Sequence, residues 1–376
     1  MSLRVLVVDD SALFRRVMTD VLATIPNVEV VGSVSNGRLA LQRVKEFHPD
    51  LMTLDMEMPE MDGLAVLDAL HQFDETPAII VVSALTRRGG QLTMQALEKG
   101  AFDFITKPDT SNAEESRETI RRELAMRVAA LSHRLEIRNI LRQKPPTSKA
   151  TMPVEKVIEA HKAPPQNLDD IAGRMARLTS TNKPEMVLIG VSTGGPNALA
   201  RLLPEIPGDI GVPLLIVQHM PPVFTQSLAE SLAAKCRIRV REASQGEKVE
   251  PNTAYIAPGG KQMRLQPGSD IGLQIQITDD PPENNCKPAV DYLFRSAANK
   301  FPGRAMAVIL TGMGNDGTLG LRLLKRHGCY VIAQDEPTCV VYGMPKSAVD
   351  AGVVDSVLAL DAIASRIVAT VRGRRA

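Results

Sequence analysis

Short apolar runs alternate with helical segments along most of this chain, and this alternation limits its fold more than any other feature. Five runs rich in Val, Ile and Leu are typical of strands, and they fall at residues 3–8, 28–34, 51–54, 78–82 and 102–106. Helical periods lie between them. This pattern predicts a parallel sheet with helices on both faces. We therefore expect an α/β, flavodoxin-like (βα)5 domain over residues 1–124.

The same alternation returns in residues 184–376. Strands are predicted at 186–191, 213–218, 237–242, 305–311 and 329–334, and helices at 196–203, 222–235, 288–300, 316–327 and 358–371. Residues 250–278 between them predict turns and antiparallel strands. The pattern indicates a second, Rossmann-like α/β domain with a β-hairpin insert. A chain of 376 residues is too long for one ordinary core, which agrees with two domains.

A helical extension and a proline-rich linker are expected to join the two domains over residues 125–183. A helical period continues from Asn112 to Gln143, and prolines then follow at positions 145, 146, 153, 164 and 165. Prolines end helices and stiffen linkers. Two short helices are expected inside the linker, near 154–161 and 168–178.

Composition excludes several classes of function. The formal net charge is +1 at pH 7 and Trp is absent, so neither a basic patch nor a stacking platform for nucleic acid is expected. No apolar run reaches the length of a membrane span, and the N-terminus does not read as a secretion signal. The four cysteines are scattered without metal-ligand spacing, which predicts reduced thiols. We expect a cytoplasmic protein that binds no nucleic acid and does not insert into a membrane.

Ser192 lies where the apolar run 186–191 breaks into the turn Gly190-Val-Ser-Thr-Gly-Gly195. A hydroxyl between a strand and a helix is exposed and lies beside free backbone N–H groups. Ser192 could be the nucleophile of an acyl transfer, or the glycines could hold a phosphate. A dinucleotide site would have an acid at the end of the next strand. The chain has Gln218 and His219 there, which favours a hydrolase.

Two further residues are candidates for the same site. His219 ends the strand that follows the Ser192 strand in sequence, and such strands usually pair. A general base would then lie close to the hydroxyl. Asp316 lies in Thr311-Gly-Met-Gly-Asn-Asp-Gly317 after another buried run. It either orients His219 or caps the next helix, and the flanking glycines leave the N–H of Met313 free to bind an oxyanion.

Carboxylates gather where the strands of the first half end. Asp9 and Asp10 follow the first strand, and Asp55 follows the third. Because the carboxyl ends of parallel strands meet in one crevice, these groups would repel one another unless a hard cation such as Mg²⁺ joined them. Ser83 and Lys107 end strands four and five at the same edge. Any one carboxylate could be a helix cap, but the set suits phosphoryl transfer to an aspartate.

This first half resembles the receiver domain of two-component response regulators over its full length. The resemblance implies that Asp55 accepts the phosphoryl group and that Asp9 and Asp10 hold Mg²⁺ together with it. The other signature positions are Ser83 as the switch hydroxyl, Phe104 as the aromatic switch and Lys107 as a contact of the phosphoryl group. Phosphorylation adds about −1.5 to −2 charges and is expected to shift the face carried by strands four and five.

The second half resembles the catalytic domain of the CheB family of chemotaxis receptor methylesterases. The motifs that carry the resemblance are 190–195, Gln218-His-Met-Pro-Pro222, Ala257-Pro-Gly-Gly260 and 311–317. By that resemblance the roles are Ser192 as nucleophile, His219 as base, Asp316 as its orienting acid, the Met313 N–H as oxyanion donor and Thr193 as support for the histidine. No cofactor or metal is expected in this half.

A receiver followed by this domain is the architecture of the family, which also deamidates receptor glutamines. The resemblance implies a chemotaxis response regulator that a chemotaxis histidine kinase phosphorylates on Asp55. Its substrates would be glutamyl γ-methyl esters of methyl-accepting chemoreceptors, and its products glutamate and methanol. We expect a monomer whose unphosphorylated receiver covers the catalytic cleft. The linker looks long for the family. The alternatives are a receiver coupled to a nucleotide- or metabolite-binding module, and a non-catalytic scaffold.

Overall fold

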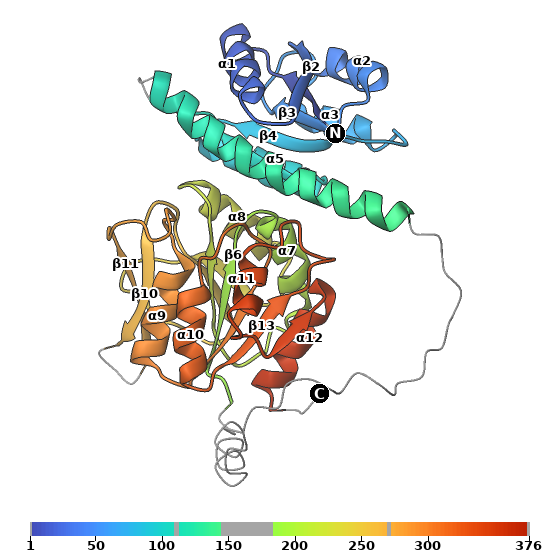
Figure 1. Ribbon diagram of the computed structural model, residues 1–376. Coiled ribbons are helices and arrows are strands. Elements are labelled where there is room, and N and C mark those ends of the chain that lie inside the picture. The colour runs from blue at the N-terminus through green and yellow to red at the C-terminus, as the bar shows by residue number, and fades with distance from the viewer. Residues whose placement is uncertain (1, 109–112, 144–182, 269–271, 374–376) are drawn as a thin grey trace, which may run out of the picture.

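The computed structural model describes residues 2–108, 113–143, 183–268 and 272–373 (Figure 1). It shows an N-terminal and a C-terminal α/β unit, each built around a parallel sheet. The proline-rich part of the expected linker, with its two short helices near 154–161 and 168–178, lies outside the described residues. In the described ranges, no helix combines the length and the apolar character that crossing a membrane requires.

The N-terminal unit has a five-stranded sheet in the order β2-β1-β3-β4-β5, and all neighbouring strands are parallel. Its strands are β1 (Leu3–Val8), β2 (Val28–Val34), β3 (Leu51–Asp55), β4 (Ala78–Ser83) and β5 (Asp103–Thr106). Its helices are α1 (Ala12–Ala23), α2 (Gly37–Phe47), α3 (Gly63–Leu70), α4 (Arg87–Glu98) and α5 (Ala113–Gln143). The expected (βα)5 fold is confirmed, and the topology brings the carboxyl ends of β1 and β3 side by side.

Local sequence explains where these helices start. Each of the first four begins after a residue whose side chain accepts a backbone N–H, namely Ser11, Asn36, Asp62 and Thr86. Such a cap satisfies a donor that the helix leaves unpaired and contributes about 1 kcal/mol. Helix α5 is held by burial of its apolar stripe, which consists of Ile120, Leu124, Val128 and Leu131. Its extent agrees with the helical period expected from 112 to 143.

The C-terminal unit has a seven-stranded sheet in the order β14-β13-β12-β6-β7-β9-β8, again parallel throughout. Its strands are β6 (Met186–Val191), β7 (Leu214–Gln218), β8 (Arg239–Glu242), β9 (Thr253–Ile256), β12 (Ala305–Ile309), β13 (Tyr330–Gln334) and β14 (Ser356–Leu358). Strand β6 pairs with β7 on one side and with β12 on the other. The chain order therefore reverses at β6, and ligands of open α/β sheets bind at such points.

Helices cover both faces of this sheet, as the burial of β6, β7 and β12 along their whole length requires. They are α7 (Gly195–Leu202), α8 (Phe224–Ala233), α9 (Val290–Lys300), α10 (Thr318–Arg326), α11 (Met344–Asp350) and α12 (Leu360–Val371). The expected hairpin is the antiparallel pair β10 (Gln262–Pro267) and β11 (Leu273–Thr278). The expectation of turns and antiparallel strands over 250–278 was wrong for β9, which runs parallel between β7 and β8.

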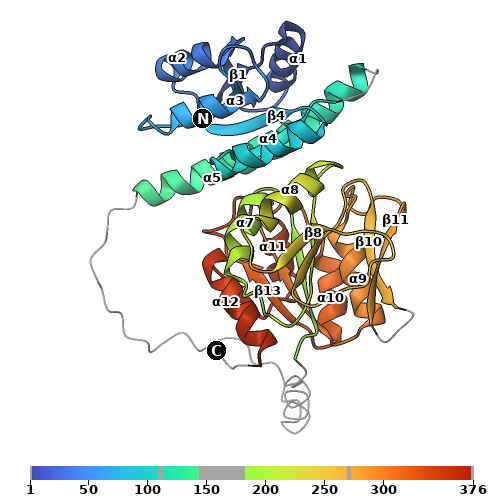
Figure 2. The ribbon, with the colours of Figure 1, turned by 180° about the vertical axis from the view of Figure 1, so that it is seen from behind.

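The two units meet along helix α4, which packs on α7 and α8 (Figures 1 and 2). In the same interface the ring of Phe104, from β5, lies on the ring of Phe224 in α8, and both are buried. At its rim, Glu98 contacts Lys235 Nζ at 2.6 Å and accepts a hydrogen bond of 2.5 Å from Ser231. An apolar centre with a polar rim is typical of a specific interface.

Candidate active site

Ser192 stands at the carboxyl end of the sheet, directly after β6. Val191 pairs with Gln218, the last residue of β7, and His219 follows directly after that strand. On the other side, the N–H of Ser192 donates to the carbonyl of Thr311, which follows β12, at 3.0 Å. The prediction that the Ser192 and His219 strands are neighbours is confirmed. The reversal point of the sheet thus brings three sequence motifs together around Ser192.

The glycines after Ser192 are explained by packing. Gly194 has a φ of 76°, which favours glycine. A Cβ on Gly195 would lie 1.9 Å from Gln218 Oε1. The N–H of Gly195 already donates to the Ser192 carbonyl at 2.7 Å, and Gln218 Nε2 donates to the same carbonyl at 3.0 Å. One of the N–H groups that a phosphate loop would offer is therefore used inside the turn, which weakens that interpretation.

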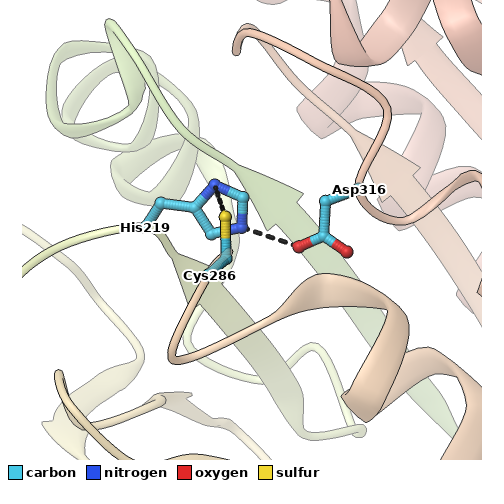
Figure 3. Close-up of side chains that lie close together, drawn as sticks. All are labelled: His219, Cys286 and Asp316. Atoms are coloured by element: carbon cyan, nitrogen blue, oxygen red, sulfur yellow. Dashed lines mark hydrogen bonds and ion pairs between the residues drawn. The ribbon is translucent and has the colours of Figure 1, made fainter. Parts of the chain in front are cut away.

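His219 and Asp316 form a hydrogen bond of 2.7 Å between Nε2 and Oδ2 (Figure 3). Asp316 Oδ2 also accepts the N–H of Val290 at 2.7 Å, and Oδ1 accepts the N–H groups of Asp291 and Gly317, both at 3.0 Å. The N-cap of α10 is Gly317, so the alternative of Asp316 as that cap is wrong. The carboxylate is buried and points at the imidazole.

These contacts set the charges of the pair. Burial alone raises the pKa of Asp316, but the hydrogen bond and the charge of His219, together with the backbone N–H groups of Asp291 and Val290, outweigh it, and the pKa is lowered from 3.8. Burial alone lowers the pKa of His219, but the hydrogen bonds with Asp316 and Cys286 outweigh it and raise this pKa to about 9. An ionised Asp316 accepts the Nε2 proton, which leaves Nδ1 as the basic nitrogen of the neutral ring.

Cys286 is the residue of this site that the sequence did not reveal. Its Sγ lies 3.6 Å from His219 Nδ1, so the ring is contacted at both nitrogens (Figure 3). Asn284 of the same loop donates through Nδ2 to Asp316 Oδ1 at 2.9 Å. The dipeptide Asn284-Asn285, with φ values of 52° and 60°, is a turn signal. This signal predicts a loop, but it does not predict where the loop packs.

The remaining predicted residues lie close by without completing a hydrogen-bonded triad. Within the described residues, the Oγ of Ser192 forms no hydrogen bond, and neither does the N–H of Met313. A Cβ on Gly312, the residue before Met313, would lie 2.7 Å from Ser192 Cβ. Thr193 contributes its carbonyl, which accepts the Thr311 hydroxyl at 2.9 Å. Both the hydroxyl and the candidate oxyanion donor are thus available to a ligand.

The acidic residues of the N-terminal unit also come together. Asp9, Asp10 and Asp55 each offer a carboxylate oxygen within 4.8 Å of the others. Lys107 Nζ lies 2.9 Å from Asp9 Oδ2 and 2.7 Å from Asp55 Oδ2. Burial raises the pKa of Asp55 to about 6 against the lowering effect of Lys107. Ser83 Oγ donates to the Gly89 carbonyl in α4 at 3.1 Å, so it bonds the helix that faces the other unit.

Two family models and a set of curated proteins match this chain. A response regulator receiver domain matches residues 5–121, and CheB methylesterase matches residues 187–367. A protein-glutamate methylesterase/protein-glutamine glutaminase of Desulfotalea psychrophila is 48% identical over 99% of each chain. A protein of the same name from Archaeoglobus fulgidus is 40% identical over 97% of each chain. The catalytic domain of Thermotoga maritima CheB methylesterase covers 49% of this chain and 97% of its own, at 42% identity and a TM-score of 0.48.

The motifs of both units and the full-length likeness to these relatives agree with each other. The chain belongs to the CheB methylesterase family and carries a response regulator receiver domain in front of the methylesterase domain.

Proposed function

We propose that the C-terminal unit is a serine hydrolase that cleaves glutamyl γ-methyl esters of methyl-accepting chemoreceptors and deamidates receptor glutamines. The names of the curated relatives give this chemical class. The observation that carries the proposal is the His219–Asp316 hydrogen bond at the end of the strand next to that of Ser192. A base oriented by a buried carboxylate beside an unengaged hydroxyl is what acyl transfer needs.

In the proposed reaction, Ser192 Oγ attacks the ester carbonyl carbon and His219 takes the hydroxyl proton at Nδ1. The tetrahedral intermediate collapses, the proton passes to the leaving methoxide, and methanol departs from the acyl-enzyme. A water molecule then gives a proton to His219 and attacks the acyl carbon. Glutamate is released, and His219 returns the proton to Ser192 Oγ. With an amide substrate, ammonia leaves instead of methanol. Nδ1 faces the thiol of Cys286 in this structure, so the Cys286 side chain has to turn away before Nδ1 takes the proton. Catalytic contacts of this kind often tighten only with substrate.

The oxyanion of the intermediate would be bound by the N–H of Met313. Among the residues that the structure describes, this donor has no hydrogen-bond partner, and it belongs to the segment whose Gly312 lies against Ser192. Removal of one oxyanion donor typically costs about 3–4 kcal/mol in the barrier. A backbone donor cannot be removed by substitution, but Gly312 can be enlarged, which would displace both the donor and Ser192.

The direct test is methanol release from methylated receptor. We expect Ser192→Ala to abolish it and Ser365→Ala, a serine in α12, to leave it intact. An activated phosphonate should label Ser192, and His219→Ala should slow that labelling. Hydrolysis that survives in Ser192→Ala would overturn this mechanism and favour the phosphate-loop interpretation, whereas no hydrolysis and no labelling in the wild type would favour a scaffold.

We also propose that the receiver restrains the hydrolase until a chemotaxis-type histidine kinase phosphorylates Asp55. The donor set of Asp9, Asp10 and Asp55 fits Mg²⁺, which prefers a few carboxylates together with phosphate and water. When bound there, this ion would neutralise charge on the transferred group. Lys107 Nζ already contacts the carboxylates of Asp9 and Asp55. The buried carboxylate of Asp9 and the ammonium of Lys107 thus preorganise the phosphoacceptor Asp55.

Contacts at the interface support a route from Asp55 to the hydrolase. Ser83 holds the start of α4 through the Gly89 carbonyl, and a Cβ on the adjacent Gly90 would lie 2.5 Å from Ser227 Oγ in α8. If Ser83 turns towards a phosphoryl group on Asp55, its hydrogen bond to α4 is lost. The close packing of α4 on α8 would then loosen, and the open population would rise.

A second contact connects the units close to the nucleophile. Val340 packs against the apolar cluster of the receiver that includes Leu131 of α5. On its other side, the same valine fills the space beside Gly194, where a Cβ would meet it at 2.5 Å. The turn after Ser192 is therefore supported from the receiver side. Separation of the two units would remove that support and expose the turn.

The regulation is tested by methanol release with and without acetyl phosphate. We expect acetyl phosphate to raise the activity of the wild type and of Asp74→Asn, which alters an exposed receiver aspartate, but not of Asp55→Asn. No response in the wild type would overturn the regulatory proposal and leave the hydrolase proposal untouched.

The finer expectations on partners and location stay proposals. We propose a monomer, since Ser192, His219 and Asp316 come from one chain, and sedimentation at several concentrations tests this. We propose a cytoplasmic protein, and cell fractionation tests that. Membrane association would arise only through the receptor, so it should disappear in cells that lack chemoreceptors.

A further inference from the structure

The loop between β11 and α9 brings a thiol into the site, as Figure 3 shows. Cys286 Sγ lies 3.6 Å from His219 Nδ1 and 3.4 Å from the carbonyl of Asn284. The thiol is neither buried nor fully exposed. Neither the reaction above nor the predicted triad uses Cys286. Its position beside His219 therefore needs a separate explanation.

His219, Cys286 and Asp316 together present the ligand types of a zinc site. One ligand atom from each lies within 4.8 Å of the others. Zn²⁺ binds imidazole, thiolate and carboxylate at about 2.0–2.3 Å with tetrahedral geometry, which separates neighbouring ligand atoms by about 3.3–3.7 Å. The distance of 2.7 Å between Nε2 and Oδ2 would have to widen, and the sulfur would have to approach. The first change is about 1 Å or less, and the second starts from ligand atoms that already lie within 4.8 Å of one another.

The carboxylate of this set is already held as a ligand would be. Asp316 Oδ1 accepts the N–H groups of Asp291 and Gly317 and the side-chain amide of Asn284. These donors fix the carboxylate and leave Oδ2 facing the imidazole. Hydrogen bonds of this kind orient metal ligands and typically change metal affinity by about 10–100-fold.

Ligand chemistry separates this cluster from the receiver site. Asp9, Asp10 and Asp55 offer oxygen only, which suits Mg²⁺, whereas sulfur and imidazole favour Zn²⁺ and Co²⁺. Among the described residues, these two clusters are the ones whose acidic, histidine and cysteine side chains meet closely enough for a metal. The other cysteines, Cys236, Cys329 and Cys339, belong to neither cluster.

We propose that His219, Cys286 and Asp316 form a Zn²⁺ site that inhibits the hydrolase. The three side chains supply three ligands, and water completes the tetrahedron. Binding displaces the thiol proton and the proton between Nε2 and Oδ2. The imidazole and the Cys286 side chain are then fixed to the metal, so Nδ1 does not reach the proton of Ser192. Metal binding itself does not depend on the proposed function, but the inhibition rests on the role of His219 as base.

Binding is tested with Co²⁺ as a spectroscopic probe, in the full chain with excess Mg²⁺ to fill the receiver site. We expect an ultraviolet thiolate-to-cobalt charge-transfer band that Zn²⁺ abolishes. The band should be absent in Cys286→Ser and Cys286→Ala and unchanged in Cys236→Ser, and Cys286→Ser should weaken Zn²⁺ binding by about tenfold or more. No band in the wild type, or a band that survives in Cys286→Ser, would overturn the proposal.

A measurement on the wild type tests the same site without relying on variants, which can misfold. Iodoacetamide alkylates accessible thiols, and mass spectrometry identifies which cysteine has reacted. We expect Zn²⁺ to slow the alkylation of Cys286 and to leave that of Cys236 unchanged. Equal rates at Cys286 with and without Zn²⁺ would contradict the site.

The inhibitory consequence is measured by methanol release. We expect Zn²⁺ to inhibit the wild type over the concentration range in which it displaces Co²⁺, and a chelator followed by Mg²⁺ to restore activity. Cys286→Ser should need about tenfold more Zn²⁺ for the same fractional inhibition. Binding without inhibition would overturn the inhibitory role. Absence of any esterase activity would count against the proposed function. The cobalt spectrum would still test the metal site, because it does not depend on activity.

Discussion

The ring of Phe104 in the receiver stacks on the ring of Phe224 in the methylesterase domain, with centroids 4.9 Å apart and planes inclined by 14°. Phe104 occupies β5, and Phe224 opens α8 only five residues after His219. The aromatic residue expected to respond to phosphorylation is therefore in direct contact with the segment that carries the proposed base. A change in the position of one ring has to be accommodated by the other, because both are buried.

Removal of the receiver ring should release the hydrolase. Aromatic pairs contribute about 0.5–1.5 kcal/mol beyond their buried area, so we expect Phe104→Ala to raise the unphosphorylated methylesterase activity by about two- to tenfold. Methanol release in an Asp55→Asn background measures this without interference from phosphorylation. Phe73→Ala, whose ring lies under Lys45 in the receiver, is the matched control and should stay at the basal rate. Equal rates in both variants would argue against the stacked pair as a restraint.

The rim of the interface allows a charge-swap test. Glu98 contacts Lys235 at 2.6 Å. Burial alone raises the pKa of Glu98, but the hydrogen bonds with Lys235 and Ser231 outweigh it, and the pKa is lowered from 4.5. We expect Glu98→Lys to raise basal methanol release by like-charge repulsion, and Glu98→Lys with Lys235→Glu to bring it back down. The single variant should lose its effect at high salt, since the groups are partly exposed. A double variant as active as the single one would contradict this.

Much of the fold was predictable because each domain repeats a local pattern. The alternation of buried runs with helices identified the parallel sheets, and the extent of α5 followed from its apolar stripe. Strand β9 was assigned wrongly because Thr253–Ile256 is only four residues long. A run that short carries no sign of its partner, and its parallel partner β7 lies far away in the sequence. Helix α11 was missed for a similar reason, since seven residues with a proline in the first turn show no clear period.

The positions of candidate site residues that directly follow strands were predictable from the sequence. The positions of those that lie in longer loops were not. His219 and Asp316 meet because both follow strands that flank β6. Cys286 comes from a loop whose path depends on the packing of Asn284 against Asp316, and no periodicity records such a contact. The hydrogen bond from Ser83 to Gly89 is equally invisible in sequence, because it depends on how α4 packs on the end of β4.

The pH dependence of the enzyme should reflect the environment of His219. Its hydrogen bonds with Asp316 and Cys286 outweigh burial and raise its pKa to about 9 from 6.5. Only the neutral ring accepts a proton from Ser192, so we expect kcat/KM to keep rising with pH up to about 9. The profile is measured with a chelator present and compared with an NMR titration of the imidazole. A plateau that is complete by pH 7 would show that the ring is not held as an imidazolium.

The same shift makes a prediction for stability. The folded pKa of His219 lies above the unfolded value, so the protonated ring stabilises the fold. This stabilisation is fully present below pH 6.5 and is lost as the pH rises through about 9. We expect the free energy of unfolding of wild type to fall over that window by more than that of His219→Gln. Parallel curves for the two proteins in urea denaturation would contradict the shift.

Asp316→Asn tests whether Asp316 orients the base, because this variant keeps His219 and changes only how its ring is held. The amide keeps the shape of the carboxylate but offers an N–H where Oδ2 now accepts from Nε2 and from Val290. The ring is then pushed towards the tautomer with its proton on Nδ1, which cannot take the serine proton. The corresponding change in a serine protease lowers kcat by about 10⁴-fold, and we expect a loss of about 10³–10⁴-fold here, with KM little changed. Asp291→Asn is the matched control, because Asp291 Oδ1 accepts the N–H of Gly320 in α10 and, among the described contacts, Asp291 forms none with the ring. A loss in Asp316→Asn no larger than in Asp291→Asn would mean that the carboxylate serves the fold and not the base.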